Sequence, residues 1–426
     1  MRGHSFASLA SLLALLPLAS TLATPGSIEQ RDDALANNTL ADDTLANSTL
    51  ADDAQLLDLF QQQALNATLD ALDAEEDSLK KRGQTASCTR QNLEIRREYG
   101  SISTSDRTAY INAVLCLQSN AAKTPSSHAP GAKTRYDDFV ATHIDQTPYI
   151  HYSGTFLGWH RYFTWVYEQA LRTECGYQGP IPYWNWPMYA SAPQDSPIFN
   201  GDEYSMGGNG EYIPHFGTVL AAIPGTDAAD IDLAPGLGGG CVQTGPFKDM
   251  KVNLGPVSLL NATVGPDGGL GYNPRCLKRD VGPGVALRFT NYTSVLQAML
   301  QQDIASFQLT LQGAPGSGSI GVHGGGHYTI KSQDSGDPGG DLFVSPGDPA
   351  FFLHHGQIDR VWTIWQALDP VNRQNAISGT GTLLNEPPSA NTTLNTIINV
   401  GYAGGTNVSM SDIMSTTKGP FCYIYL

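Results

Sequence analysis

Two stretches of the chain, FLGWHRYFTWVYEQALRTE at residues 156–174 and DPAFFLHHGQIDRVWTIWQAL at residues 348–368, decide the fold. In both, apolar and aromatic residues recur every three to four positions, which predicts helices with one buried face. Pro370 is expected to stop the second helix. Because Gly/Pro-rich stretches separate these helices, the sequence predicts a mainly α fold with long irregular loops at residues 176–218, 222–286 and 313–349.

Histidines gather around both predicted helices in two sets of three. The first set is His143, His151 and His160. The second set is His323, His327 and one of the adjacent pair His354 and His355. Neutral imidazole binds copper, zinc and iron well, and burying six imidazoles without a shared role would be costly. The two triads therefore predict a site for two metal ions, both left open to substrate.

The first 23 residues have the features of a signal peptide. Arg2 precedes an apolar stretch from Leu9 to Leu18, and small residues follow at Ala19 to Ala23. The stretch is shorter than the roughly 20 apolar residues that a membrane span needs, and no later stretch reaches that length. The sequence therefore predicts a secreted protein that has no membrane partner.

Residues 24–82 differ in composition from the rest of the chain. They hold 13 acidic and 4 basic residues, a short repeat in TLADDTLANSTLADD, and Phe60 as their one aromatic residue. Such a stretch is too poor in bulky apolar groups to bury a core of its own. It ends in Lys80, Lys81 and Arg82, which indicates a propeptide removed by a protease that cuts after paired basic residues. Residues 83–426 would then be the catalytic domain; the alternative is a flexible tail that stays attached.

Charge and cysteines limit the class of protein further. The net charge of −16 comes mostly from residues 24–82, and no basic cluster indicates a nucleic-acid partner. All six cysteines follow Arg82, and an even number in a secreted chain predicts three disulfides, with fifteen pairings open. No CxxC spacing indicates a thiolate metal site. Sequons predict a glycoprotein modified at Asn261, Asn291, Asn391 and Asn407.

The motifs around the triads resemble those of the type 3 copper proteins: the tyrosinases, catechol oxidases and molluscan haemocyanin units. They are FLGWHR at residues 156–161, PYWNW at 182–186, the HxxxH pair at 323–327 and DPAFFLHHGQIDRVW at 348–362. The resemblance extends from about His143 to Trp365, and the layout is most similar to the short secreted fungal polyphenol oxidases. Tyr423 and Tyr425 resemble the tyrosine motif that closes the family's catalytic domain.

The resemblance implies two copper ions per chain, held on a four-helix bundle. Copper A would be bound by His143, His151 and His160, and copper B by His323, His327 and His355. His355 has Asp359 one helical turn later as a possible acceptor for its N–H, whereas His354 has Ile358 there, so His354 is predicted not to bind metal. Arg161 is expected either to pair with Asp359 and fix the helices around the metals, or to lie on the surface.

Three glycines stand inside the second triad, at Gly324, Gly325 and Gly326. In a helix, each costs about 1 kcal/mol relative to alanine, so a compensating demand is expected. Either the missing side chains let a flat phenolic ring approach copper B, or they let helices pack closely. Tyr328 is a candidate for the wall of the substrate pocket, and residues 332–346 are candidates for its rim.

The resemblance also implies the reaction, in which a phenolic substrate is oxidised to a quinone while O2 is reduced to water. Relatives that hydroxylate monophenols carry Asn after the first copper B histidine and a Glu upstream; here Gly324 takes that place, and residues 308–322 contain no carboxylate. A phenol has a pKa of about 10, so without a positioned base its binding as phenolate is slow. Oxidation of o-diphenols should therefore exceed monophenol hydroxylation.

Several alternatives remain open from the sequence. Within the family they are a tyrosinase with full monophenolase activity, an o-aminophenol oxidase and a haemocyanin-like oxygen carrier. Outside it, a dinuclear zinc hydrolase would normally need bridging carboxylates, which these motifs lack. Tyr149 stands where many relatives have a cysteine linked to histidine by a thioether, so this bond is expected to be missing.

Overall fold

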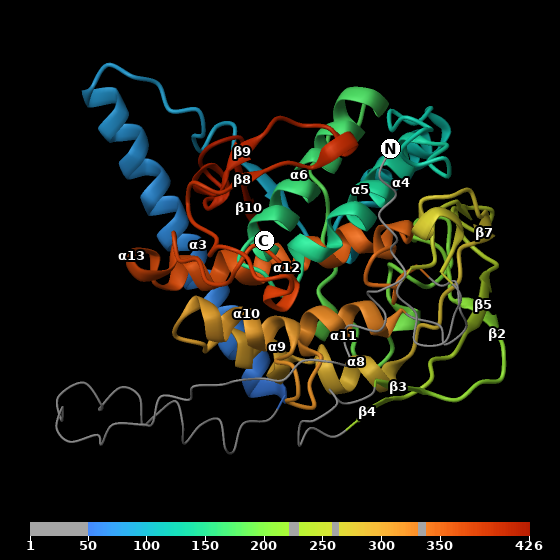
Figure 1. The fold of residues 1–426 in the computed structure, drawn as a ribbon. Helices are drawn as coiled ribbons and strands as arrows, with labels where there is room; N and C mark the ends of the chain where they lie inside the picture. The colour runs from blue at the N-terminus through green and yellow to red at the C-terminus, as the bar shows by residue number, and fades with distance from the viewer. Residues whose placement is uncertain (1–49, 221–229, 258–263, 331–337) are drawn as a thin grey trace.

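The computed structural model describes residues 50–220, 230–257, 264–330 and 338–426. The predicted signal peptide and residues 24–49 lie outside the described residues. Helices dominate the described part of the chain, and long irregular segments connect them (Figure 1). The prediction of a mainly α fold with irregular loops is confirmed.

Four helices supply the histidines of both triads: α5 (Arg135–Ile150), α6 (Phe156–Cys175), α11 (Gly321–Thr329) and α12 (Ala350–Leu368). α6 and α12 coincide with the two periodic stretches of the sequence, and α12 ends just before Pro370, as predicted. α5 packs against α6, and α12 packs against α6 and α11. The finer geometry of a four-helix bundle stays a prediction.

The remaining helices surround these four. They are α3 (Leu50–Lys81), α4 (Thr104–Ser119), α7 (Trp186–Tyr189), α8 (Pro283–Phe289), α9 (Tyr292–Met299), α10 (Ile304–Gln312) and α13 (Pro370–Arg373). α4 packs against α5 and α6, whereas α8 and α10 pack against α11. Outer helices therefore pack against α5, α6 and α11.

Aromatic rings fill the space between α5, α6 and α12. The rings of Tyr167 and Phe352 stack with centroids 3.5 Å apart, and Phe139 meets Phe163 edge to face at 5.6 Å. All four side chains are buried. Such ring pairs contribute about 0.5–1.5 kcal/mol each beyond the free energy of their burial. This cluster therefore stabilises the packing of α5, α6 and α12.

The strands are short and form five two-stranded sheets in the described residues. β1 (Glu94–Arg96) pairs in parallel with β10 (Tyr423–Tyr425), with Glu94 opposite Tyr423. The other pairs are antiparallel: β2 (Gly210–Tyr212) with β5 (Gly239–Val242), β3 (Thr218–Leu220) with β4 (Ile231–Leu233), β6 (Lys251–Val252) with β7 (Arg275–Cys276), and β8 (Ile397–Ile398) with β9 (Val408–Ser409). The β1 and β10 pair brings together two segments that lie far apart in the sequence.

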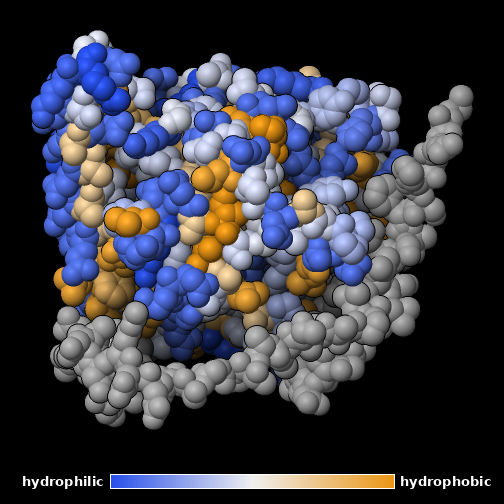
Figure 2. Space-filling model, turned by 60° about the vertical axis from the view of Figure 1, so that its left-hand side comes forward, coloured by the Kyte–Doolittle hydropathy of each residue, from blue (hydrophilic) through white to orange (hydrophobic). Residues whose placement is uncertain are grey.

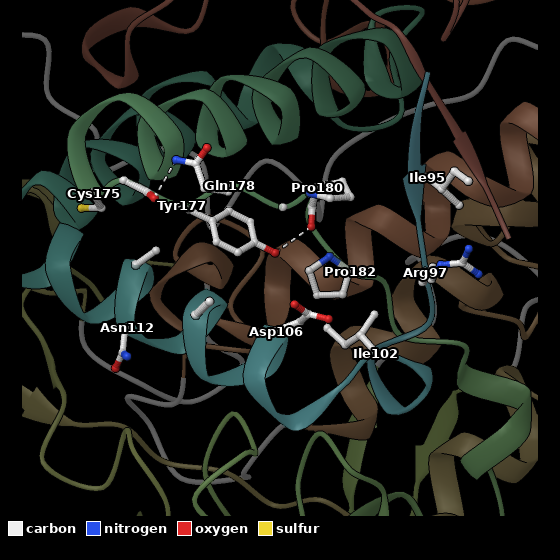
Figure 3. A pocket seen from close by; sticks show the side chains of 14 residues that line it. Ile95, Arg97, Ile102, Asp106, Asn112, Cys175, Tyr177, Gln178, Pro180 and Pro182 are labelled. Atoms are coloured by element: carbon white, nitrogen blue, oxygen red, sulfur yellow. Dashed lines mark hydrogen bonds between the residues drawn. The ribbon is translucent and has the colours of Figure 1, made fainter. Parts of the chain in front are cut away.

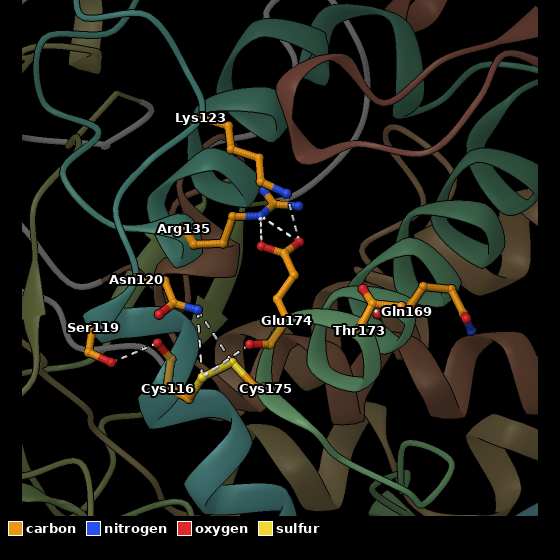
Figure 4. The surroundings of a disulfide bond; sticks show 9 residues. All are labelled: Cys116, Ser119, Asn120, Lys123, Arg135, Gln169, Thr173, Glu174 and Cys175. Atoms are coloured by element: carbon orange, nitrogen blue, oxygen red, sulfur yellow. Dashed lines mark hydrogen bonds and ion pairs between the residues drawn. A yellow bond between two sulfur atoms is a disulfide. The ribbon is translucent and has the colours of Figure 1, made fainter.

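All six cysteines form disulfides, as predicted. The bonds are Cys88–Cys422, Cys116–Cys175 and Cys241–Cys276. The second ties α4 to the last residue of α6, where the Glu174 carboxylate also accepts from Arg135 Nε at 3.0 Å (Figure 4). The third pins the long loop between residues 222 and 286. No cysteine is left for a thioether to histidine.

Helix α3 lies in residues that we predicted to be too poor in apolar groups to form a core. These residues form no core of their own, because the helix packs its apolar side chains against α9 and α12. Ala64 and Leu72 are each 3% exposed. The residues that face the domain are alanines and leucines at helical spacing, which composition alone conceals. Part of the predicted propeptide is thus an ordered, docked helix.

In the described part of the chain, no helix combines the length and the apolar character needed to cross a membrane. On the face shown in Figure 2, hydrophilic surface predominates and hydrophobic surface is confined to narrow strips.

Candidate metal centre

The structure brings the histidines of both triads into one buried region. The candidate ligand atoms of His143, His151 and His160 all lie within 4.8 Å of one another, and the same holds for those of His323, His327, His354 and His355. The two groups meet where the rings of His160 and His355 stack, with centroids 4.3 Å apart and planes 10° from parallel. Residues separated by almost 200 positions thus form one histidine cluster.

Backbone carbonyls fix the orientation of four of these rings. The Nδ1–H groups donate from His143 to Phe343 (2.8 Å), from His151 to Thr147 (3.2 Å), from His160 to Phe156 (2.8 Å) and from His327 to Gly339 (3.1 Å). Because Nδ1 carries the proton, Nε2 keeps its lone pair for a metal. Gly339 and Phe343 belong to the segment predicted as a pocket rim, and in its described part their carbonyls orient two of the histidines.

The Nε2 atoms also lack protein partners. Those of His143, His160, His323, His354 and His355 are buried, and no hydrogen-bond partner faces them in the described part of the chain. Buried polar atoms are nearly always paired, so five unpaired Nε2 atoms in one histidine cluster need an explanation. Metal ions at both triads would satisfy those of His143, His160, His323 and His355, and an all-imidazole donor set suits copper.

Burial also keeps these rings neutral. It lowers the pKa of His151 from 6.5 to about 3 and that of His327 to about 4, and it lowers the pKa of His143, His160 and His355 well below the usual value. Removing water from the cation is the main cause, and neighbouring histidines add to it. At neutral pH the rings are therefore unprotonated, as metal binding requires.

His354 differs from the other histidines of the second group. Trp186 Nε1–H donates to His354 Nδ1 at 3.0 Å. An indole is a donor only, so this bond occupies the lone pair of Nδ1 and places the ring proton on Nε2. His354 then has no free lone pair for a metal, which favours His355 as the ligand.

The three glycines of α11 have two different surroundings. A Cβ at Gly326 would lie 2.3 Å from the His354 ring, and one at Gly325 would lie 2.7 Å from Phe289 Cβ. These two glycines are needed for close packing against α12 and α8. A Cβ at Gly324 would lie 2.9 Å from the Cβ of Ile320, the residue just before the helix, and Gly324 is partly exposed. Gly324 is therefore the one of the three glycines that close packing against a neighbouring helix does not explain.

The histidine cluster is most open along α11. His327 is 9% exposed and His323 is 5% exposed, whereas the other histidines of the cluster are exposed by 2% or less. Tyr328, predicted as a pocket wall, is partly buried and packs against a small apolar cluster that includes Phe289 and Ile320. The two most exposed histidines of the cluster therefore both belong to α11, and Tyr328 as a pocket wall stays a prediction.

Asp359 forms one of the two contacts that we predicted for it. The predicted pair with Arg161 is formed, with Nε 2.5 Å from Oδ1 and both side chains buried. The expected hydrogen bond from His355 to Asp359 is not: His355 Nδ1 has no partner among the described residues. The hydroxyls of Tyr423 and Tyr425 instead donate to Asp359 Oδ2 at 2.7 and 2.6 Å. Together with the Arg96 guanidinium, whose Nη1 lies 3.5 Å from Oδ2, two tyrosines and two arginines thus surround both carboxylate oxygens.

A buried arginine that the sequence analysis did not identify completes this network. Arg96 donates to Glu168 and to the Tyr425 hydroxyl, both at 2.9 Å, and its guanidinium lies 3.5 Å from the centre of the Tyr423 ring. The network therefore joins β1, β10, α6 and α12. The sequence analysis had identified Arg161, Asp359 and the two tyrosines of this network, whereas Arg96 and Glu168 belong to no motif.

A separate surface cavity of about 360 Å³ lies between α4, β1 and the segment after α6 (Figure 3). It is lined by residues that include Ile95, Ile102, Asp106 and Tyr177, and none of the site histidines is among them. The Tyr177 hydroxyl donates to the Pro180 carbonyl oxygen at 2.8 Å within this wall. The cavity is distinct from the histidine cluster.

Comparison with known proteins places this geometry in a family. The family model for the common central domain of tyrosinase matches residues 133–368. Tyrosinase P of Aspergillus terreus is 40% identical over 336 residues, covering 78% of this chain and 92% of the relative. An N-acetyl-6-hydroxytryptophan oxidase of Emericella nidulans is 38% identical over 354 residues, covering 79% and 93%.

The fold agrees with a solved structure. A polyphenol oxidase variant from Thermothelomyces thermophila matches with a TM-score of 0.82 and 51% identity, covering 88% of this chain and 98% of that chain. This coverage is more than residues 83–426 alone can supply, so the match extends well before Gly83. The chain therefore belongs to the tyrosinase family and is a type 3 copper oxidoreductase.

Proposed function

We propose that this protein is a secreted polyphenol oxidase that oxidises o-diphenols to o-quinones and reduces O2 to water, with monophenol hydroxylation weak or absent. The family acts on phenolic substrates with O2. The observation that supports the proposal most is the set of buried imidazoles whose Nε2 atoms have no protein partner. His143, His151 and His160 would hold copper A, and His323, His327 and His355 would hold copper B.

The residues of the chain have three tasks in this reaction. Copper, when bound, supplies the redox chemistry that passes electrons from the phenol to O2. The carbonyls of Phe343, Thr147, Phe156 and Gly339 hold the imidazoles in the binding orientation. Burial of both triads excludes bulk water, and a flat aromatic ring would approach along α11, where the two most exposed histidines and Gly324 lie.

The preference for diphenols is supported by what is missing around Gly324. Glycine offers no side-chain amide to hold a water molecule, and residues 308–322 contain no carboxylate. A monophenol with a pKa of about 10 then has no positioned base to accept its proton. A catechol can be oxidised without hydroxylation of its ring, so it needs no such base for that step.

Oxygen uptake by the copper-loaded full chain tests the proposed substrate class. We expect the fastest uptake with catechol, slow or no uptake with tyrosine, and none without copper. Equal rates for tyrosine and catechol would establish the tyrosinase alternative. Fastest turnover of o-aminophenol would establish the aminophenol oxidase, and reversible oxygen binding without turnover would indicate an oxygen carrier.

We also propose that residues 1–23 direct secretion and that a protease cuts the chain after Arg82. Three disulfides suit an oxidising compartment. Arg82 and Gly83 are exposed just after the end of α3, where a protease has access. N-terminal sequencing of the secreted protein should give a chain that starts at Gly83; a start at Thr24 alone would contradict the processing step.

A further inference from the structure

Helix α3 contacts the catalytic domain through one face. Leu57, Phe60, Ala64 and Leu72 recur at helical spacing on that face, with Ala64 and Leu72 each 3% exposed and the other two packed against the main core. Their neighbours are α9 and α12. Leu59, by contrast, is 50% exposed. The apolar positions of α3 therefore complete the core rather than face solvent.

Polar contacts tie α3 to the domain from its first turn to its last. Asp53 is 1% exposed and accepts from the hydroxyl of Thr293 in α9. Gln61 Nε2 donates to the Tyr425 carbonyl oxygen of β10 at 3.0 Å. Towards the end of the helix are two exposed ion pairs, Arg90 with Asp73 at 2.7 Å and Lys418 with Glu75 at 2.9 Å. The buried contacts contribute most, since exposed pairs add little.

No covalent bond besides the main chain links α3 to the rest of the protein. The first cysteine is Cys88, so all three disulfides lie within residues 83–426. The exposed residues Arg82 to Thr85 follow the helix, and Figure 1 shows the end of α3 at one edge of the molecule. A cut after Arg82 would leave the buried contacts of the helix intact.

From these contacts we infer that α3 stays bound to the catalytic domain after the chain is cut, so that the processed enzyme consists of two non-covalently associated chains. This inference builds on the processing step proposed above. The structural match with the Thermothelomyces thermophila oxidase extends well before Gly83, which supports the docking of α3 on the domain.

The bound helix contacts the elements that carry the second triad and its neighbouring network. α3 packs against α12, which carries His355 and Asp359. It also donates a hydrogen bond to β10, whose two tyrosine hydroxyls donate to Asp359. Loss of the helix would expose the apolar side of α12 and free one end of this network. We therefore expect the helix to stabilise copper binding at the second triad, without contributing a ligand.

Native size-exclusion chromatography of the cut protein, followed by denaturing mass spectrometry of the eluted peak, tests the inference. The copper-loaded full chain is cut after Arg82 by a protease specific for paired basic residues. We expect both chains in one peak in equal amounts, and their separation once the protein is denatured without reductant. A peak that contains residues 83–426 alone would overturn the inference.

Two matched variants separate specific docking from mere co-elution. Leu72→Asp places a charge in the buried face and should release the fragment after cutting, whereas Leu59→Asp on the exposed face should leave it bound. If Leu72→Asp does not fold, Leu72→Ala provides a milder test, with partial release expected. Equal retention in the Leu72 and Leu59 variants would contradict the docking seen in the structure.

The processing step and the docking are tested independently. If the secreted chain is never cut after Arg82, an engineered protease site in the exposed segment 83–86 allows the same chromatography. Retention of the fragment there would uphold the docking while the processing proposal fails. Copper content is measured in the Leu72→Asp variant before the cut and again after the fragment has been released. We expect the copper content to fall; unchanged copper would rule out the supporting role.

Discussion

At the scale of single residues, Gly324 and Gly326 predict effects of different size for the same substitution. Gly326→Ala would press a methyl group into the His354 ring, 2.3 Å away, and should destabilise the protein by about 1–3 kcal/mol. Gly324→Ala meets the Cβ of Ile320 at 2.9 Å and requires a smaller shift, and a gain of up to about 1 kcal/mol of helix propensity offsets its cost, so we expect a clearly smaller loss. Urea unfolding of both copper-free variants measures the difference; equal effects would contradict the two environments.

The adjacent histidines His354 and His355 allow a direct test of the ligand assignment. His355→Ala should lose the copper of the second triad and so half of the bound metal, because its unpaired Nε2 is the ligand. His354→Ala should keep both copper ions, since Trp186 occupies its Nδ1 lone pair. Metal analysis after dialysis gives the copper content of each variant. The reverse pattern would exchange the two roles.

At the scale of elements, β10 acts as an anchor for α12. The Tyr425 hydroxyl donates to Asp359 at 2.6 Å inside a buried network. Tyr425→Phe should lower the free energy of unfolding by about 1.5–3 kcal/mol, the usual range for a hydrogen bond to a charged group. Chemical denaturation measures this loss, and Tyr212→Phe, at a tyrosine 65% exposed, is the control. Similar small losses in both would show that the Tyr425 hydrogen bond adds little to stability.

The elements also show how far the sequence could predict the structure. Periodicity located α6 and α12, and the clustered histidines predicted the residues that the structure brings together in two groups. α3 was missed because the apolar residues of its contact face, mostly alanine and leucine, lie in an acidic stretch. The acceptors Gly339 and Phe343 bind through backbone carbonyls, which leave no trace in side-chain chemistry. Partners such as Trp186 and His354, 168 positions apart, become visible only in the folded chain.

At the scale of the whole molecule, two contacts between α6 and α12 connect the two triads, one between histidine rings and one between charged side chains. The rings of His160 and His355 stack, and Arg161, which directly follows the first, pairs with Asp359, one turn after the second. The same two helices therefore carry both the histidine contact and the ion pair. Because the second link is buried and lies outside the metal region, it can fix the separation of the triads before copper binds.

The histidine cluster as a whole predicts how the stability of the copper-free protein depends on pH. Seven histidines are buried there, and their pKa values are lowered, that of His327 to about 4 and that of His151 to about 3. In the unfolded chain each returns to a pKa of about 6.5. As the pH falls below that value, the unfolded chain binds protons that the folded chain excludes, so stability must decrease, by up to about 1.4 kcal/mol per pH unit for each histidine.

Urea unfolding of the copper-free protein at a series of pH values between 7.5 and 5 measures this dependence. Carboxylates, with pKa values of about 4, change little in this range, so the slope reports mainly the histidines. We expect a steep and continuous loss of stability below about pH 6.5. In the copper-loaded protein the loss should begin at lower pH, because protons then compete with metal for the same Nε2 atoms. A flat profile for the copper-free protein would mean that the cluster is already open to water and protons.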